Sequence, residues 1–147
     1  MECVVDSSVA AKLLVTEPFS QQAVALFALL QVAPPARFYV PDLLYIECAN
    51  ILWKHVRRFG LSQAYAQQSL LDLSRLPLTT VSTKALMTGA LDVGLAYQLA
   101  AYDACYVVLA DSLNIPLVTA DEIMVRKLAQ TAFDVRWIGS WPPVVLK

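Results

Sequence analysis

The chain has 147 residues, of which 58% are hydrophobic and only 16% are charged, and its formal net charge is −1. This length suits one domain with a sizeable core, so we expect residues 1–147 to form a single domain. The net charge excludes binding to nucleic acid through overall basicity, and the low charged fraction predicts an apolar surface patch for a partner.

The three cysteines, Cys3, Cys48 and Cys105, lie inside apolar segments and show no CxxC or Cys/His spacing. We therefore expect core thiols in a reducing compartment, not disulfides or zinc ligands. The first apolar run lacks a basic leader and is interrupted by Asp6, so no signal peptide is expected. No apolar stretch has the length of a membrane span. These features predict a cytoplasmic protein.

The first part of the sequence alternates short apolar runs with helical patterns. The expected elements are a strand at 3–5, a helix from about 9 to 16, a helix at 20–32, a strand at 38–40 and a helix from 43 to about 58. No charged residue lies between Glu17 and Arg37, so the helix at 20–32 should be covered on more than one side. Gly60 is expected to end the helix that precedes it.

The second part continues this alternation. The expected elements are a helix at 63–75 capped by Ser62, a strand at 78–81, a helix capped by Ser82 that ends at about 96, a helix through 104–110, a strand at 117–119, a helix at 123–130 and a strand at 135–138. Residues 104–110 are apolar on every face, which predicts a buried helix. The whole pattern predicts an α/β fold, a three-layer α/β/α sandwich with a mostly parallel central sheet.

Three aspartates occupy positions where this fold would otherwise require none. Asp6 follows the first strand and Asp121 follows the strand at 117–119, and open α/β sheets place their ligands at such carboxyl ends. Asp103 lies in the first turn of the buried helix, where the helix dipole favours an anion. Each aspartate also has a simple structural explanation as a helix cap or helix start.

Glu47 is the fourth acid, and it is the hardest to explain structurally. At helical spacing it shares a face with Leu44 and Ile51. A carboxylate on an apolar face costs several kcal/mol unless it is neutralised or paired. Taken together, the four acids favour a functional site over coincidence.

The segments DSSV, PDLLYIECANIL and AYDACYVVLADSLNIPLVTADE resemble the PIN domain family, and within it the VapC-like toxins of VapBC toxin-antitoxin pairs. The resemblance covers nearly the whole chain, and YDA…LA…PLVTAD is its most specific part. It implies an acidic quartet of Asp6, Glu47, Asp103 and Asp121, with Ser7 and Thr119 supporting the site by hydrogen bonds and Asn50 at a polar position on the Glu47 helix. It also implies RNA as substrate and a cognate antitoxin as partner.

The chemistry expected of four neighbouring carboxylates follows from their charge. They repel one another, so they titrate as a coupled set, and a divalent cation relieves the repulsion. Oxygen ligands suit Mg²⁺ or Mn²⁺ better than zinc. Such an ion activates a water, which predicts hydrolysis of phosphodiester bonds. The single histidine, His55, lies eight residues past Glu47 and is not expected to be a ligand or base.

An acidic pocket needs local basic groups to attract an acidic polymer. Lys54, Arg57 and Arg58 follow Glu47 along its helix and are the candidates for phosphate binding. The alternative is a solvated helix end whose basic residues complement the dipole.

Apolar surface predicts partners for this chain. The uncharged helix at 20–32, and a face formed by Leu43, Tyr45 and Trp53, together predict a homodimer contact and an antitoxin groove.

Other classes of protein remain to be separated from the nuclease. A phosphatase requires a second acid where this chain has Ser8, and a receiver domain requires an acidic pair where Asp6 stands alone. Ser7 and Ser8 lack a basic partner, which disfavours a serine hydrolase. A solitary PIN-type RNA-processing nuclease and a non-catalytic module that holds a metal ion remain open alternatives.

Overall fold

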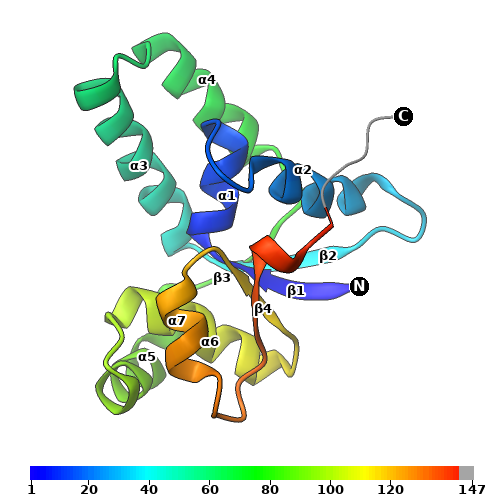
Figure 1. Ribbon diagram of the computed structural model, residues 1–147, viewed down its shortest axis with the longest axis vertical. Helices are drawn as coiled ribbons and strands as arrows, with labels where there is room; N and C mark the ends of the chain where they lie inside the picture. Colours follow the sequence, from blue (N-terminus) through cyan, green and yellow to red (C-terminus); the bar gives the residue numbers. More distant parts are fainter. Residues whose placement is uncertain (143–147) are drawn as a thin grey trace.

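The computed structural model describes residues 1–142, which contain a five-stranded sheet in the order β3-β2-β1-β4-β5 (Figure 1). The strands are β1 (Glu2–Val5), β2 (Arg37–Pro41), β3 (Thr79–Val81), β4 (Leu117–Thr119) and β5 (Val135–Trp137). All four neighbouring pairs are parallel. The expected α/β fold is therefore confirmed, and the sheet of the described residues is parallel throughout.

Helices cover both faces of this sheet, as the prediction of three layers requires. On one face lie α1 (Ser7–Leu14), α2 (Ser20–Ala28), α3 (Leu43–Phe59) and α4 (Gln63–Ser74), and on the other lie α5 (Thr83–Tyr97), α6 (Ala101–Leu113) and α7 (Glu122–Leu128) (Figure 1). Short 3-10 turns follow α2 at Leu29–Gln31 and β5 at Ile138–Ser140.

The strand order creates a switch point between β1 and β4. The chain passes from β1 to β2 on one side, and later returns to place β4 on the other side of β1. The register pairs Val4 with Tyr39 of β2 and with Leu117 of β4. Doubly wound sheets bind ligands at the carboxyl ends of the strands that flank such a point.

α6 is the buried helix that the sequence predicts. Its run from Ala104 to Ala110 is almost wholly inaccessible, and Tyr106 is the largest of the fully buried side chains. Asp103 lies in the first turn of this helix. Cys3, Cys48 and Cys105 are buried free thiols, as expected.

Several helix ends are formed by the expected residues. Ser62 Oγ accepts the Tyr65 N–H at 3.0 Å and caps α4. Gly60 adopts φ +70° and ends α3, because only a residue without Cβ takes this conformation freely. The side chain of Ser82 makes no capping bond, contrary to prediction. Instead, Asp42 Oδ1 accepts the Thr83 N–H at 2.9 Å at the start of α5.

The uncharged segment at 20–32 differs from its prediction. It forms α2 only to Ala28 and then tightens into a 3-10 turn. Ala23, Leu26 and Phe27 are buried, whereas Val24 on the other side is 49% exposed. Residues 1–142 therefore leave one face of α2 uncovered, and cover on a second side remains a prediction.

Within residues 1–142, no single helix has both the length and the hydropathy of a membrane span. α5 and α6 reach that length and hydropathy only when taken together, and the two helices are bent by 110° relative to each other.

Candidate active site

The carboxyl edge of the sheet brings Asp6 and Asp121 to the same place. Asp6 follows β1 at the N-cap position of α1, and Asp121 follows β4 at the N-cap position of α7. The Asp6 N–H donates to the carbonyl of Val118 in β4 at 3.0 Å, which fixes the two strand ends relative to each other. The two acids thus flank the switch point.

The Asp6 carboxylate is buried and surrounded by hydroxyl donors. It is 3% exposed, and its Oδ2 accepts from Thr119 Oγ1 at 2.6 Å and from Ser8 Oγ at 2.7 Å. Ser7 Oγ donates to Oδ1 at 3.3 Å. Burial raises the pKa of Asp6 above its ordinary value, and the hydroxyl donors oppose that rise. The hydroxyl groups thus hold the Asp6 carboxylate in place, while its burial disfavours the charged form.

Thr119 and Ser8 extend this network to the end of β4. Thr119 Oγ1 accepts the Asp121 N–H at 3.1 Å, and Ser8 Oγ accepts the Ala120 N–H at 3.0 Å. From the sequence, Ser8 was interpreted only as a candidate nucleophile and as the residue in place of a phosphatase's second acid, so this role was missed. Its spacing of two residues from an aspartate at a helix start is the signal that could have revealed it.

Glu47 projects from the second turn of α3 and is half-buried. Its Oε1 accepts a hydrogen bond from the Tyr106 hydroxyl at 2.6 Å. Burial raises the pKa of Glu47, the Tyr106 bond lowers it, and the charges of Asp6 and Asp103 raise it further. Tyr106 was not identified from the sequence. Its position three residues after Asp103, on the same side of a helix, is the available signal.

Asp103 and Asp121 complete the set of acids. Burial, together with the charges of Asp6 and Asp121, raises the pKa of Asp103 to about 6. Asp121 Oδ1 accepts the N–H groups of Ile123 and Met124 at 2.9 and 3.0 Å. Asp121 therefore caps α7 as well as facing the other acids, so its structural explanation also holds.

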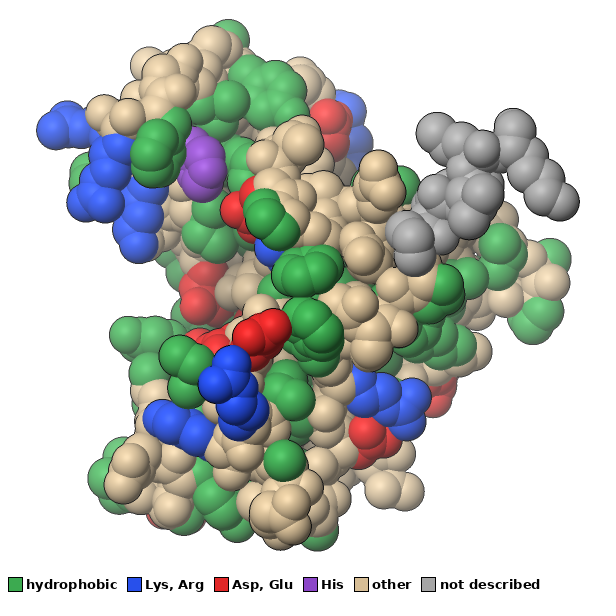
Figure 2. Space-filling model, in the orientation of Figure 1, with side chains coloured by type: hydrophobic (Ala, Val, Ile, Leu, Met, Phe, Trp, Pro, Cys, Tyr) green, Lys and Arg blue, Asp and Glu red, His purple; other side chains and the backbone are tan. Residues whose placement is uncertain are grey.

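These acids lie in a hollow of the molecular surface. Figure 2 shows acidic side chains in the recess at left, between the α3 side of the molecule and the side formed by α5 to α7, with basic side chains on both rims. The charge of Asp6 raises the pKa values of both Glu47 and Asp103, so these three carboxylates lie within electrostatic reach of one another. The charge of the fourth acid, Asp121, also raises the pKa of Asp103.

The recess continues as a groove along α3, which we call the α3 groove. It has a volume of about 810 Å³, runs from Leu43 past Glu47 and Asn50 to Lys54, and includes Tyr102 of α6. Asn50 is thus beside Glu47, as expected, but it makes no hydrogen bond to a described residue. Arg57 and Arg58 are exposed in the last turn of α3, beyond the lining residues.

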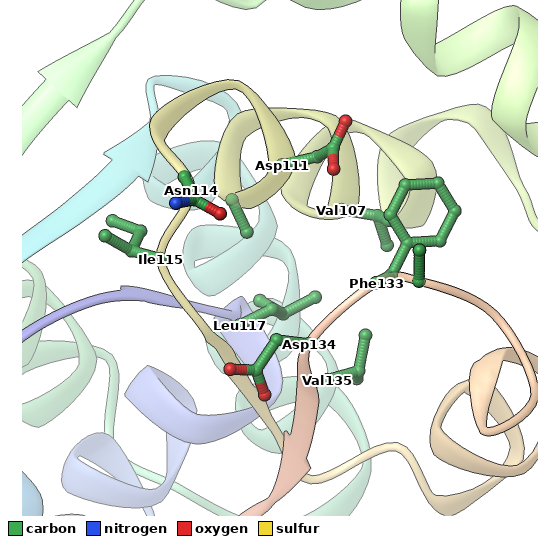
Figure 3. A pocket seen from close by; sticks show the side chains of 10 residues that line it. Val107, Asp111, Asn114, Ile115, Leu117, Phe133, Asp134 and Val135 are labelled. Atoms are coloured by element: carbon green, nitrogen blue, oxygen red, sulfur yellow. The ribbon is translucent and has the colours of Figure 1, made fainter.

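A second, smaller cavity of about 70 Å³ lies at the other edge of the sheet (Figure 3). It is lined by the end of α6 and the starts of β4 and β5, including Asp111, Asn114 and Asp134. Both Asp134 oxygens accept from Arg136, at 2.9 and 2.8 Å. This cavity is separate from the acidic recess.

The acidic recess has the donor chemistry of a site for a hard cation. Its four carboxylates offer only oxygen, and the raised pKa values of Asp6, Glu47 and Asp103 indicate that a nearby positive charge would favour their ionised forms. Within residues 1–142, however, no three His, Cys, Asp or Glu side chains are close enough to hold one ion as they stand. Direct coordination of one ion by three of these acids would therefore require their side chains to rotate, whereas one or two carboxylates and several waters can also hold Mg²⁺.

Residues 3–129 match the PIN domain, and the chain belongs to this family. It is 33% identical to Ribonuclease VapC3 of Pyrobaculum aerophilum over 129 residues, which cover 86% of this chain and 95% of that protein.

Two solved structures share the fold. The crystal structure of PAE2754 from Pyrobaculum aerophilum has a TM-score of 0.68 at 23% identity, covering 95% of this chain and 92% of that one. A toxin-antitoxin complex from Klebsiella pneumoniae has a TM-score of 0.63 at 15% identity, covering 91% and 95%.

Proposed function

We propose that this protein is a Mg²⁺- or Mn²⁺-dependent endoribonuclease and the toxin of a VapBC-type toxin-antitoxin pair. The observation that carries the proposal is the grouping of four carboxylates from four segments near the sheet's switch point. Burial raises the pKa values of Asp6, Glu47 and Asp103, and the charges of neighbouring carboxylates raise those of Glu47 and Asp103 further. The similarity to Ribonuclease VapC3 supports RNA as the polymer.

The roles of the acids follow from how each is held. Asp6, Glu47, Asp103 and Asp121 are the proposed ligands of the ion. When bound, that ion supplies a water of lowered pKa and stabilises charge on the leaving oxygen. Thr119 and Ser8 hold Asp6, and Tyr106 holds Glu47, so these two carboxylates are oriented before substrate arrives. Pre-oriented ligands reduce the reorganisation required during reaction.

The outer end of α3 is proposed to bring the phosphates of RNA to an otherwise repulsive pocket. Lys54 lines the groove that begins at Glu47, and Arg57 and Arg58 lie one turn further on. Their positive charge offsets the negative potential of the recess at the point where the polymer enters.

Partners are proposed from exposed apolar surface. Val24 on α2 is 49% exposed, and Met87, Leu91 and Leu95 form an exposed stripe along α5. We propose that a second copy of the chain and a cognate antitoxin cover such surfaces in the cytoplasm. The presence of a toxin-antitoxin complex from Klebsiella pneumoniae among the structural relatives supports the antitoxin.

Cleavage of RNA by the purified chain tests the enzymatic part. We expect cleavage with Mg²⁺ or Mn²⁺ and none after chelation, with Asp103→Asn inactive in both conditions. Cleavage that persists undiminished in excess chelator would overturn the mechanism.

The identity of the neighbouring reading frame tests the toxin assignment. A small adjacent protein with a DNA-binding amino-terminal half, which co-purifies with this chain and suppresses cleavage, is the expected result. If no such partner exists, the protein is a solitary nuclease.

A further inference from the structure

The outer half of the α3 groove combines an exposed aromatic ring with unpaired positive charge. Trp53 is 55% exposed and lines the groove beside Lys54. The guanidinium carbon of Arg57 lies 5.7 Å from the centroid of the Trp53 ring. Tyr102, which is 58% exposed, lines the same groove from α6. Aromatic faces beside cations are the elements from which binding sites for single-stranded nucleic acid are built.

The charges on this helix are available to a ligand. Among the described residues, Lys12, Arg37, Arg75, Arg126 and Arg136 each form an ion pair. Lys54, Arg57 and Arg58 form none. Three cations without acidic partners at one helix end favour a polyanion over an apolar peptide or a second copy of the same surface.

Helix geometry connects this surface to the acids. Lys54 is seven residues beyond Glu47, about 10 Å along the helix axis at 1.5 Å per residue. Ile46 and Trp53 are also seven residues apart, so they stack along one face of α3. Both belong to the lining of the groove. A single strand of nucleic acid that follows this face of α3 would reach the acidic recess without leaving the groove.

We propose that the α3 groove binds an unpaired segment of RNA, with a base stacked on Trp53 and the adjacent phosphates held by Lys54 and Arg57. This inference rests on the proposed function and adds a selection for single strands. Bases within a duplex are stacked on each other and present no free face to the indole, whereas unpaired bases do. Trp53 is then a specificity-determining residue at the entrance to the site.

α3 also provides a matched control. Phe59 is 72% exposed but does not line the groove. It lies six residues past Trp53, about 120° around a helix with 3.6 residues per turn. Its ring packs 5.3 Å from that of His55. Loss of Phe59 removes an exposed aromatic side chain from the same helix without changing the groove.

Fluorescence anisotropy tests the proposal with the full chain carrying Asp103→Asn, so that the RNA remains intact. The probes are a labelled unstructured RNA 12-mer and an RNA hairpin of matched length. We expect Trp53→Ala to weaken 12-mer binding by about 5- to 100-fold and Trp53→Phe to restore most of it, while Phe59→Ala has no effect. The hairpin stem should bind more weakly and be insensitive to Trp53. Lys54→Ala should reduce the salt dependence of 12-mer binding.

Trp53→Leu keeps an apolar side chain and guards against misfolding of the alanine variant. Equal affinity of Trp53→Leu, Trp53→Phe and the parent for the 12-mer would overturn the proposal. The proposal would also be overturned if the Trp53 variants changed the molecular mass in solution but bound RNA as well as the parent. The groove would then be a contact between copies of the chain.

Failure of the proposed function gives a different result. If the protein with its native Asp103 does not cleave RNA while Trp53 still governs 12-mer binding, the groove is an RNA site on a protein that is not a ribonuclease. If RNA is cleaved and Trp53→Ala cleaves and binds as well as the parent, the proposal about the groove is wrong.

Discussion

Asp6 and Asp121 follow neighbouring strands at the same edge of the sheet, yet their carboxylates are held in opposite ways. Asp6 is buried, accepts three side-chain hydroxyl bonds, and has a raised pKa because of its burial. Asp121 is partly exposed and accepts two backbone N–H groups that would otherwise be unsatisfied at the start of α7. The first arrangement serves the site at a cost in stability, whereas the second also stabilises the fold.

The other two acids resemble Asp6 more than Asp121. Glu47 is held by a tyrosine hydroxyl, and Asp103 has a raised pKa and no hydrogen bond to a described residue. Unlike Asp121, none of these three carboxylates caps a helix through its side chain. Substitutions should separate function from stability at these three positions and combine them at Asp121.

The largest effect is expected for Asp103→Asn. The amide keeps the size of the carboxylate but removes a charge and a strong metal ligand, so cleavage should fall by orders of magnitude. In chelator the variant should melt at the same temperature as the parent protein or higher. Mg²⁺ at roughly 100 times its dissociation constant should stabilise the parent by about 2.7 kcal/mol and the variant much less. Strong destabilisation of the metal-free variant would make Asp103 a structural residue.

Tyr106→Phe should come next in size. It removes the hydroxyl that donates to Glu47 at 2.6 Å and leaves the buried ring in place. Residues that orient metal ligands typically contribute about 10- to 100-fold to activity or metal affinity, so a loss of this size in kcat, with little change in KM, is expected. Steady-state kinetics and a Mn²⁺ titration would measure it. An unchanged titration would mean that Glu47 is held by other groups.

Substitutions of Asp121 test its contribution to the stability of the fold. Asp121→Ala should lower the free energy of unfolding in chelator by about 0.5 to 2 kcal/mol because α7 loses its cap, whereas Asp121→Asn should lower it much less. Denaturant melts of both variants would show the difference. If alanine and asparagine were equally stable, the cap would contribute nothing to the fold.

The last expected effect is a pH dependence of stability in the absence of metal. The folded pKa of Asp103 is about 6, above its ordinary value of 3.8, so between these values the folded state binds more protons than the unfolded state. The free energy of unfolding should therefore decrease as pH rises from about 4 to 6, and this contribution should level off above 6. The decrease should be smaller in Asp103→Asn. Denaturation of the parent and of Asp103→Asn in chelator, at several pH values across this range, would measure both free energies of unfolding.

The sequence predicted the fold because its signals are local and consistent. Short apolar runs alternate with helical patterns, and each expected strand is found in the sheet. The resemblance to the PIN domain is confirmed by the family match. The end of α2 and the capping of α5 were predicted less well, since a tightened turn and the long-range bond from Asp42 to Thr83 depend on tertiary contacts.

The network around the acids was only partly predictable. Ser7 and Thr119 were expected to support the site, and both donate to Asp6. Ser8 and Tyr106 were missed because their roles depend on segments far apart in sequence: Ser8 reaches the end of β4, and Tyr106 reaches α3. The function of Lys54, Arg57 and Arg58 remains a prediction, as does the metal-binding role of the four acids.

Anomalous diffraction from crystals grown with Mn²⁺ would show directly whether the four acids form a metal site. We expect a strong peak in the recess, bounded by the carboxylates of Asp6, Glu47, Asp103 and Asp121, with at least one of these side chains rotated toward the ion. The peak should be absent or much weaker in Asp103→Asn crystals grown in the same way. Well-ordered crystals without a peak in the recess at saturating Mn²⁺, or with Mn²⁺ held elsewhere, would contradict it.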